Sequence, residues 1–122
     1  MTKASISCFL MLATATLHGA PPGAKGVQEL KAFFQQNCVR CHGEDGSATS
    51  PEGKHLKGLN FTSPKDMEGK TDQELIRTIR KGLFFGLAMP SFKAQLSEEE
   101  AGLLVREVVR KAEKGKAIKP EP

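Results

Sequence analysis

The sequence predicts an all-α domain with about three main helices joined by long loops. Three segments carry apolar residues at the three- and four-residue spacing of a helix that buries one face; they begin at about residues 27, 71 and 97. No segment alternates between apolar and polar residues over the length of a strand. A chain of 122 residues fits one domain, and its 39% hydrophobic content without Trp or Tyr predicts a modest core.

Residues 1–20 have the features of a signal peptide. Lys3 supplies a positive start, and residues 6–17 form an apolar stretch of 12, which suits a signal peptide and is too short to span a bilayer. We expect cleavage between about residues 15 and 20, followed by a Pro/Gly linker at residues 21–26. The sequence therefore predicts a periplasmic protein with no stable membrane span in the mature chain.

The first predicted helix, residues 27–37, leads directly into the motif Cys38-x-x-Cys41-His42. Two cysteines at this spacing, followed at once by a histidine, form the attachment signature of a c-type haem. One turn of chain lets each thiol bond one vinyl group, while the histidine is carried under the porphyrin to ligate the iron. We therefore predict one covalent haem c held by Cys38 and Cys41, with His42 as an iron ligand.

Two other kinds of site use the same cysteine spacing, a redox dithiol and half of a zinc site. A thioredoxin-like dithiol follows a strand, whereas a helix is predicted before Cys38. A structural zinc usually takes a second pair of ligands, and the third cysteine, Cys8, falls in the signal peptide. His55 could add one ligand, but no residue is spaced to pair with it. Both alternatives remain rivals of the haem.

Residues 43–70 are rich in Gly, Ser, Pro and Lys and are predicted to form one long loop. A loop of this length in a small domain needs something to organise it, and the edge of a haem would do so. His55 in this loop is interpreted as solvent-exposed, with haem ligation as the alternative. Met67, between two acidic residues, is expected at the surface.

The second helix is predicted to begin at Thr71, which forms a capping box with Glu74, and to stop at Gly82. The loop after it carries Met89, whose backbone is restricted by Pro90. A methionine on such a loop can direct its thioether sulfur at the iron from the side opposite the histidine. Although a buried methionine is more often core filler, we predict Met89 as the second iron ligand.

A second capping box, Ser97 with Glu100, begins the last helix. The predicted domain spans residues 27–113, and residues 114–122 have no apolar stripe and are expected to form a flexible tail. The formal net charge is only +4, and the basic residues are scattered along the chain, so the sequence gives no argument for nucleic-acid binding.

From about residue 27 to residue 112 the chain resembles a class I cytochrome c. The likeness rests on these motifs in this order: a helix ending in Phe34-x-x-x-Cys38-x-x-Cys41-His42, a long loop, a helix, Met89-Pro90-x-Phe92, and a closing amphipathic helix. The resemblance implies a small all-α fold wrapped around one haem, with the first and last helices crossing beside it. It also implies His42 and Met89 as axial ligands and the two cysteines as thioether attachments.

Three positions depart from the family pattern. Members usually carry a glycine where this chain has Leu30, and often an aromatic residue where it has Val108. The two changes would compensate each other if bulk has moved from one helix to the other at nearly constant volume. Members also usually have a loop proline whose carbonyl accepts a bond from the proximal histidine. Pro51 is the nearest candidate, but its neighbours fit poorly, so this role is not transferred to it.

Two fixed axial ligands would fill all six iron positions, so the predicted activity is one-electron transfer and not catalysis. Redox protein partners, a donor and an acceptor, would dock transiently at the haem edge near Arg40, Lys81 and Lys93. If Met89 does not bind, the iron is five-coordinate and the protein is a haem sensor or enzyme. A further alternative is a dedicated cytochrome subunit of a larger oxidoreductase complex.

Overall fold

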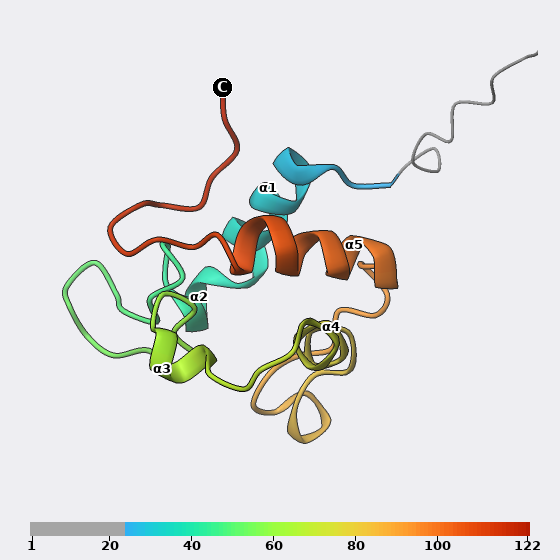
Figure 1. Cartoon of the computed structure of the whole chain (residues 1–122), viewed down its shortest axis with the longest axis horizontal. Helices are drawn as coiled ribbons and strands as arrows, with labels where there is room; N and C mark the ends of the chain where they lie inside the picture. The colour runs from blue at the N-terminus through green and yellow to red at the C-terminus, as the bar shows by residue number, and fades with distance from the viewer. Residues whose placement is uncertain (1–23) are drawn as a thin grey trace, which may run out of the picture.

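Helix α1 (Val27–Asn37) forms where the sequence has its first apolar stripe, and this stripe is buried. The computed structural model describes residues 24–122; the predicted signal peptide and the first half of the linker lie outside this range. A four-residue helix, α2 (Val39–His42), follows α1 almost without a break (Figure 1). The cysteine–histidine motif therefore begins at the end of α1 and lies on one helical turn.

Capping boxes begin the other two main helices, as predicted. Helix α4 (Asp72–Lys81) starts after Thr71, whose hydroxyl accepts a hydrogen bond from the third amide of the helix at 3.2 Å, and it ends at Gly82. Helix α5 (Glu98–Leu104) starts after Ser97 in the same way, with a distance of 3.1 Å. Each box satisfies amides that the first turn of a helix leaves without a backbone partner.

The last helix continues beyond α5 as a π-helical turn, η2 (Val105–Val109). The Arg110 amide donates to the Val105 carbonyl, five residues earlier, at 2.8 Å. A change of helix type leaves the apolar spacing almost unchanged. The sequence therefore predicts the helix but not its wider turn.

The segment predicted as one long loop contains a short helix, α3 (Pro64–Met67). Ser63 caps this helix by accepting a hydrogen bond from the Asp66 amide at 3.2 Å, and Pro64 suits the first position because no amide hydrogen is needed there. Four residues are too few to show an apolar period. The prediction for Met67 was wrong: its side chain is partly buried against the core, although its neighbours are charged.

Residues 24–122 contain no strand, only isolated β-bridges between Thr49 and His55 and between Leu83 and Met89. The all-α class is thus confirmed. In the same range, no helix is both long and apolar enough to cross a membrane. A short 3₁₀ turn, η1 (Phe84–Gly86), lies inside the second bridge.

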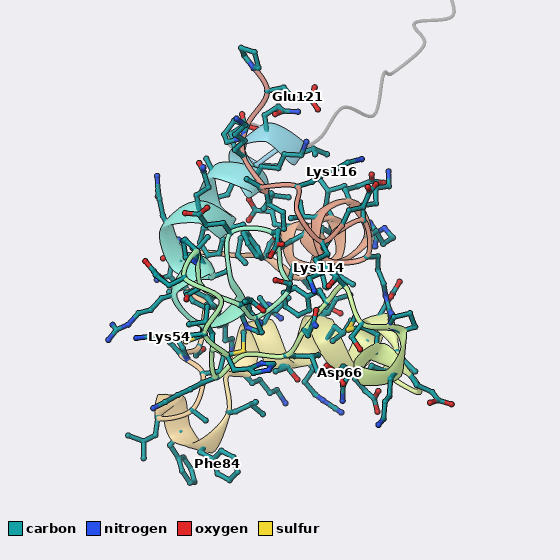
Figure 2. All side chains as sticks on the ribbon, turned by 90° about the vertical axis from the view of Figure 1, so that its left-hand side faces the viewer. Lys54, Asp66, Phe84, Lys114, Lys116 and Glu121 are labelled. Carbon is teal, nitrogen blue, oxygen red and sulfur yellow. The ribbon has the colours of Figure 1, made fainter. Side chains whose placement is uncertain are left out.

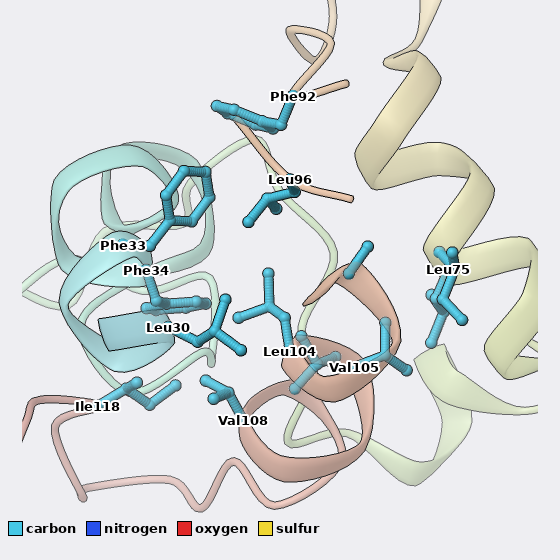
Figure 3. Packing of buried hydrophobic residues seen from close by; sticks show 13 residues of the cluster. Leu30, Phe33, Phe34, Leu75, Phe92, Leu96, Leu104, Val105, Val108 and Ile118 are labelled. Atoms are coloured by element: carbon cyan, nitrogen blue, oxygen red, sulfur yellow. The ribbon is translucent and has the colours of Figure 1, made fainter. Parts of the chain in front are cut away.

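The core lies where α1 contacts the last helix and α4 packs against that helix as well (Figures 1 and 3). Leu30 of α1 is fully buried, and Val108 of η2 is only 3% exposed. Figure 3 shows both side chains, with Leu104, in the same part of the core. The two positions that depart from the family pattern therefore lie in the same core cluster, on two elements, α1 and η2, that contact each other.

The C-terminal segment, predicted to be a flexible tail, packs against the domain. Ile118 is buried, and its amide donates to the Glu44 carbonyl at 2.7 Å. The Glu121 amide donates to the Gln28 side chain on α1 at 2.6 Å, and its carboxylate pairs with Lys31 at 3.2 Å. A single apolar residue forms no stripe, which is why the sequence did not indicate this contact.

Candidate cofactor site

A cavity of about 660 Å³ brings together the four residues predicted to bind haem: Cys38, Cys41, His42 and Met89. Most of the remaining lining is apolar; it includes Phe34, Phe61, Leu75, Ile79, Phe92 and Leu104. The charged lining consists of three basic residues, Lys57, Lys70 and Arg77, and two acidic ones, Glu68 and Glu74, so basic groups are present for the two carboxylates of a haem. Large, mostly apolar cavities with a few polar groups are typical of cofactor sites. The residues present therefore fit a c-type haem.

Cys38 and Cys41 are free thiols on one helical turn, with the Cys41 amide donating to the Cys38 carbonyl at 3.2 Å. Burial, together with the nearby Cys41 thiol, raises the pKa of Cys38 to about 12. Cys38 is therefore protonated at neutral pH. Redox dithiols are activated by a lowered pKa, so these surroundings do not favour a dithiol oxidoreductase.

A zinc site needs several ligands that converge on one point. Within residues 24–122, no group of three His, Cys, Asp or Glu side chains is placed to hold a metal ion. His55 is exposed and does not line the cavity. The zinc alternative therefore finds no donor set in the described part of the chain.

The loop backbone orients His42. Its Nδ1 donates a hydrogen bond to the Leu59 carbonyl at 3.0 Å, since a carbonyl oxygen can only accept. This tautomer leaves Nε2 as the nitrogen that can ligate a metal. The ring stacks on Phe61, with centroids 4.5 Å apart and planes 16° from parallel. Burial lowers the pKa of His42, although the Leu59 carbonyl acts in the opposite direction, so the neutral ring is favoured.

The Leu59 carbonyl is a site group that was not predicted from the sequence. Pro51, the proline considered for this role, is exposed and does not line the cavity. Gly58 brings the correct carbonyl into place: its amide donates to the Cys41 carbonyl at 2.7 Å, and a β-carbon there would overlap that carbonyl and the His42 ring. A lone glycine in a loop is a weak signal of such a close approach.

Met89 is partly buried at the cavity, on the loop between α4 and the last helix. Its carbonyl accepts a hydrogen bond from the Leu83 amide at 2.9 Å, and Gly82 lies against the same carbonyl. Phe92 then fixes the end of this loop by packing edge-on against Phe33 of α1, with centroids 5.4 Å apart. Backbone contacts on one side and an aromatic contact on the other hold the thioether at the cavity.

The residues of the predicted basic rim, Arg40, Lys81 and Lys93, are all exposed. Within residues 24–122, none of them takes part in an ion pair. Their charges are therefore available to other molecules.

The family model and the similar solved structures both indicate a c-type cytochrome. The family model described as Cytochrome C oxidase, cbb3-type, subunit III matches residues 25–106. A search of curated proteins found no match. Among solved structures, the KustC0563 c-type cytochrome is 30% identical over 69% of this chain and 96% of its own, with a TM-score of 0.53. A mutant of that cytochrome is 32% identical over 69% and 98% of the two chains, with a TM-score of 0.54.

The fold also occurs inside a larger protein. Dihydro-heme d1 dehydrogenase NirN, solved in complex with DHE, is 19% identical over 73% of this chain but only 16% of its own, with a TM-score of 0.51. At this identity the likeness shows the fold alone.

Proposed function

Because the chain belongs to the cytochrome family described as Cytochrome C oxidase, cbb3-type, subunit III, we propose that Cys38 and Cys41 attach its haem and that His42 and Met89 are the axial ligands. A covalent haem c and haem-based electron transfer follow from the family and from the c-type cytochromes of the same fold. The observation that carries the residue assignment is the one cavity that all four side chains line.

When bound, the haem supplies one-electron chemistry. The chain's own residues hold and tune it. The Leu59 carbonyl keeps the His42 ring in one tautomer, and the bridge to Leu83 keeps Met89 at the cavity. The apolar lining limits the access of water, and a thioether ligand favours the ferrous state. These features support a carrier of fairly high reduction potential.

We assign the protein the role of an electron carrier and not of an enzyme. With His42 and Met89 both bound, no iron position would remain for a substrate. Donor and acceptor proteins would dock transiently at the rim formed by Arg40, Lys81 and Lys93. The haem domain is residues 27–113 in this proposal, and the protein is exported to the periplasm, with its signal peptide removed by cleavage between about residues 15 and 20.

A cytochrome subunit of a larger complex is the second candidate. The family description names an oxidase subunit, and NirN carries this fold as a small part of a dehydrogenase chain. Purification from the native source separates the two candidates. A free carrier elutes alone, whereas a subunit remains with an oxidoreductase through several columns.

Absorption spectra of the holoprotein test the ligand assignment. We expect a sharp α-band on reduction, a weak far-red band in the ferric state, and no change with carbon monoxide. Met89→Ala should abolish the far-red band and allow carbon monoxide to bind. Met67→Ala is the matched control, because Met67 is partly buried but does not line the cavity.

A wild-type spectrum that is high-spin and shifts with carbon monoxide would contradict Met89 ligation and favour the five-coordinate sensor or enzyme. A far-red band that persists in Met89→Ala would exclude Met89 but leave electron transfer in place. The first outcome would reject both the Met89 ligand and the electron-carrier function, whereas the second would reject the ligand alone.

A further inference from the structure

The loop between Gly82 and Met89 exposes large apolar side chains. Their exposed fractions are 45% for Leu83, 75% for Phe84, 107% for Phe85 and 90% for Leu87; these four residues are called the apolar tip here. No other large apolar side chain in residues 24–122 is exposed in this way. Figure 2 shows Phe84 at the end of a projection from the body of the molecule.

The apolar tip is an ordered structure. Inside it, the Gly86 amide donates to the Leu83 carbonyl at 3.1 Å, and the Leu87 amide donates to the Phe84 carbonyl at 3.0 Å. Phe84 and Phe85 have φ angles of 50° and 54°, in the left-handed region that is unfavourable for aromatic residues. The fold therefore holds two phenylalanines outward against both backbone preference and hydration. Such a feature indicates a contact outside the chain.

The charged residues nearest to the apolar tip in the sequence have one sign. Between residues 81 and 94 the charged residues are Lys81 and Lys93, both exposed. Neither has an ion-pair partner among residues 24–122. An apolar projection flanked by lysines complements an anionic lipid surface, because the apolar groups enter the boundary of the hydrocarbon while the ammonium groups meet the headgroups.

We propose that the apolar tip inserts into the surface of a membrane that contains anionic phospholipid. A protein partner would need a matching hollow for each projecting side chain, whereas lipid fills the space around any convex shape. A second copy of the chain is disfavoured, because pairing two tips would bring the lysines of both copies, all of one charge, into the same interface. The proposal goes beyond electron transfer and does not depend on which residues ligate the iron. It places Lys81 and Lys93 at the lipid headgroups, so a membrane-bound molecule would meet its redox partners at Arg40.

Lipid insertion would also orient the cofactor site. Leu83 belongs to the apolar tip and lines the cavity, as does Ala88 just after the tip. The two bridge hydrogen bonds between Leu83 and Met89 join the tip to the cavity wall. Insertion would therefore turn this wall of the cavity toward the lipid surface.

Co-sedimentation of the holoprotein with vesicles tests the proposal. At low ionic strength we expect binding to vesicles of phosphatidylcholine with phosphatidylglycerol, and much weaker binding to pure phosphatidylcholine. The double variant Phe84→Asn, Phe85→Asn should bind about a hundredfold more weakly, since two aromatic side chains no longer leave water. Asparagine adopts the left-handed region more readily than phenylalanine, so the tip keeps its backbone.

A charge variant and its control complete the experiment. Lys81→Glu with Lys93→Glu should weaken binding to the anionic vesicles about tenfold or more. Lys54→Glu with Lys114→Glu makes the same charge change at exposed sites well away from Phe84 (Figure 2) and should have a much smaller effect. High ionic strength should abolish the difference in vesicle binding between the two charge variants, because it screens their charges.

Absence of vesicle binding by the wild-type holoprotein would overturn the proposal, as would equal binding by the asparagine variant or equal effects of the two charge variants. A concentration-dependent dimer without vesicles, lost in the asparagine variant, would assign the tip to a second copy and also overturn it. The visible spectrum of each variant reports on the cofactor separately. Failure of lipid binding is therefore distinguishable from failure of the proposed electron-carrier function.

Discussion

The Met89 carbonyl faces Gly82 so closely that a β-carbon at Gly82 would lie 2.5 Å from its oxygen. Gly82 also has a φ of 73°, in the left-handed region, where it ends α4. The end of the helix and the approach of the Met89 loop therefore both require a residue without a side chain at this position.

Gly82→Ala should displace the Met89 loop. We expect loss of the ferric far-red band and a decrease of about 2–4 kcal/mol in the free energy of unfolding, from left-handed strain plus steric overlap. Gly53→Ala is the control, because Gly53 has a φ of 81° and does not line the cavity, and a β-carbon there would meet nothing within 4 Å. It should cost only about 1–2 kcal/mol and keep the band. If denaturant unfolding shows the same loss of unfolding free energy in both variants, the overlap with the Met89 carbonyl does not contribute to the instability of Gly82→Ala.

Gly58→Ala tests the support of His42. At a loop glycine with an ordinary φ, alanine usually raises stability by about 0.4–1 kcal/mol, because it restricts the unfolded chain. Here the new β-carbon would overlap the Cys41 carbonyl and the His42 ring, so we expect the opposite sign and a lower yield of holoprotein. Thermal unfolding measures the stability, and haem absorbance per mole of protein measures the holoprotein yield, with the protein quantified by amino-acid analysis because the chain has no Trp or Tyr. A more stable variant with full haem content would show that the loop can move aside at no cost.

The parts of this protein that could be predicted from the sequence depend on local signals. Thr71 begins a helix through neighbours three residues away, and the spacing of Cys38 and Cys41 is set within one turn. The Leu59 carbonyl could not be found in this way, because every residue has a carbonyl and only tertiary contacts select this one. Ile118 was missed for a related reason: its burial depends on a distant surface and not on a periodic pattern.

Glu100 should make stability depend on pH in the acid range. Hydrogen bonds from the Ser97 and Lys25 amides, at 2.9 and 2.8 Å, lower the pKa of its carboxyl to about 2 from an ordinary value of 4.5. Because the folded-state pKa is the lower one, this contribution is fully present above about pH 4.5 and is lost as the pH falls toward 2. Glu100→Gln should therefore be destabilised at neutral pH, with the difference from wild type shrinking over that window.

Denaturant unfolding at a series of pH values measures this difference. The control is Glu99→Gln, since within residues 24–122 the Glu99 side chain makes no ion pair. Its difference from wild type should stay small at every pH. A Glu100→Gln difference that does not change between pH 4.5 and 2 would show that its carboxylate is not held by these amides.

Ile118→Ala tests whether the C-terminal segment stabilises the domain. Its buried side chain lies near Gly46, and its amide holds the Glu44 carbonyl. We expect the free energy of unfolding to fall by about 2 kcal/mol, as for other buried Ile→Ala changes. Lys119→Ala, at the exposed next position, should have little effect. Equal stabilities of the two variants would restore the flexible tail that the sequence suggested.

Leu30 and Val108 should be energetically coupled. Both are buried where α1 meets the last helix, so Leu30→Gly leaves a cavity and weakens the helix, at a cost of about 3–5 kcal/mol. Val108→Phe alone overfills the same region and should cost about 1–3 kcal/mol. Together, the new ring fills the space that Leu30 vacates, and the double variant should be at least about 1 kcal/mol more stable than the two separate losses predict.

Val105→Phe is the control, because Figure 3 places Val105 toward Leu75 and α4, and its combination with Leu30→Gly should be additive. Additivity for Val108 as well would show that the two departures from the family pattern do not compensate for each other.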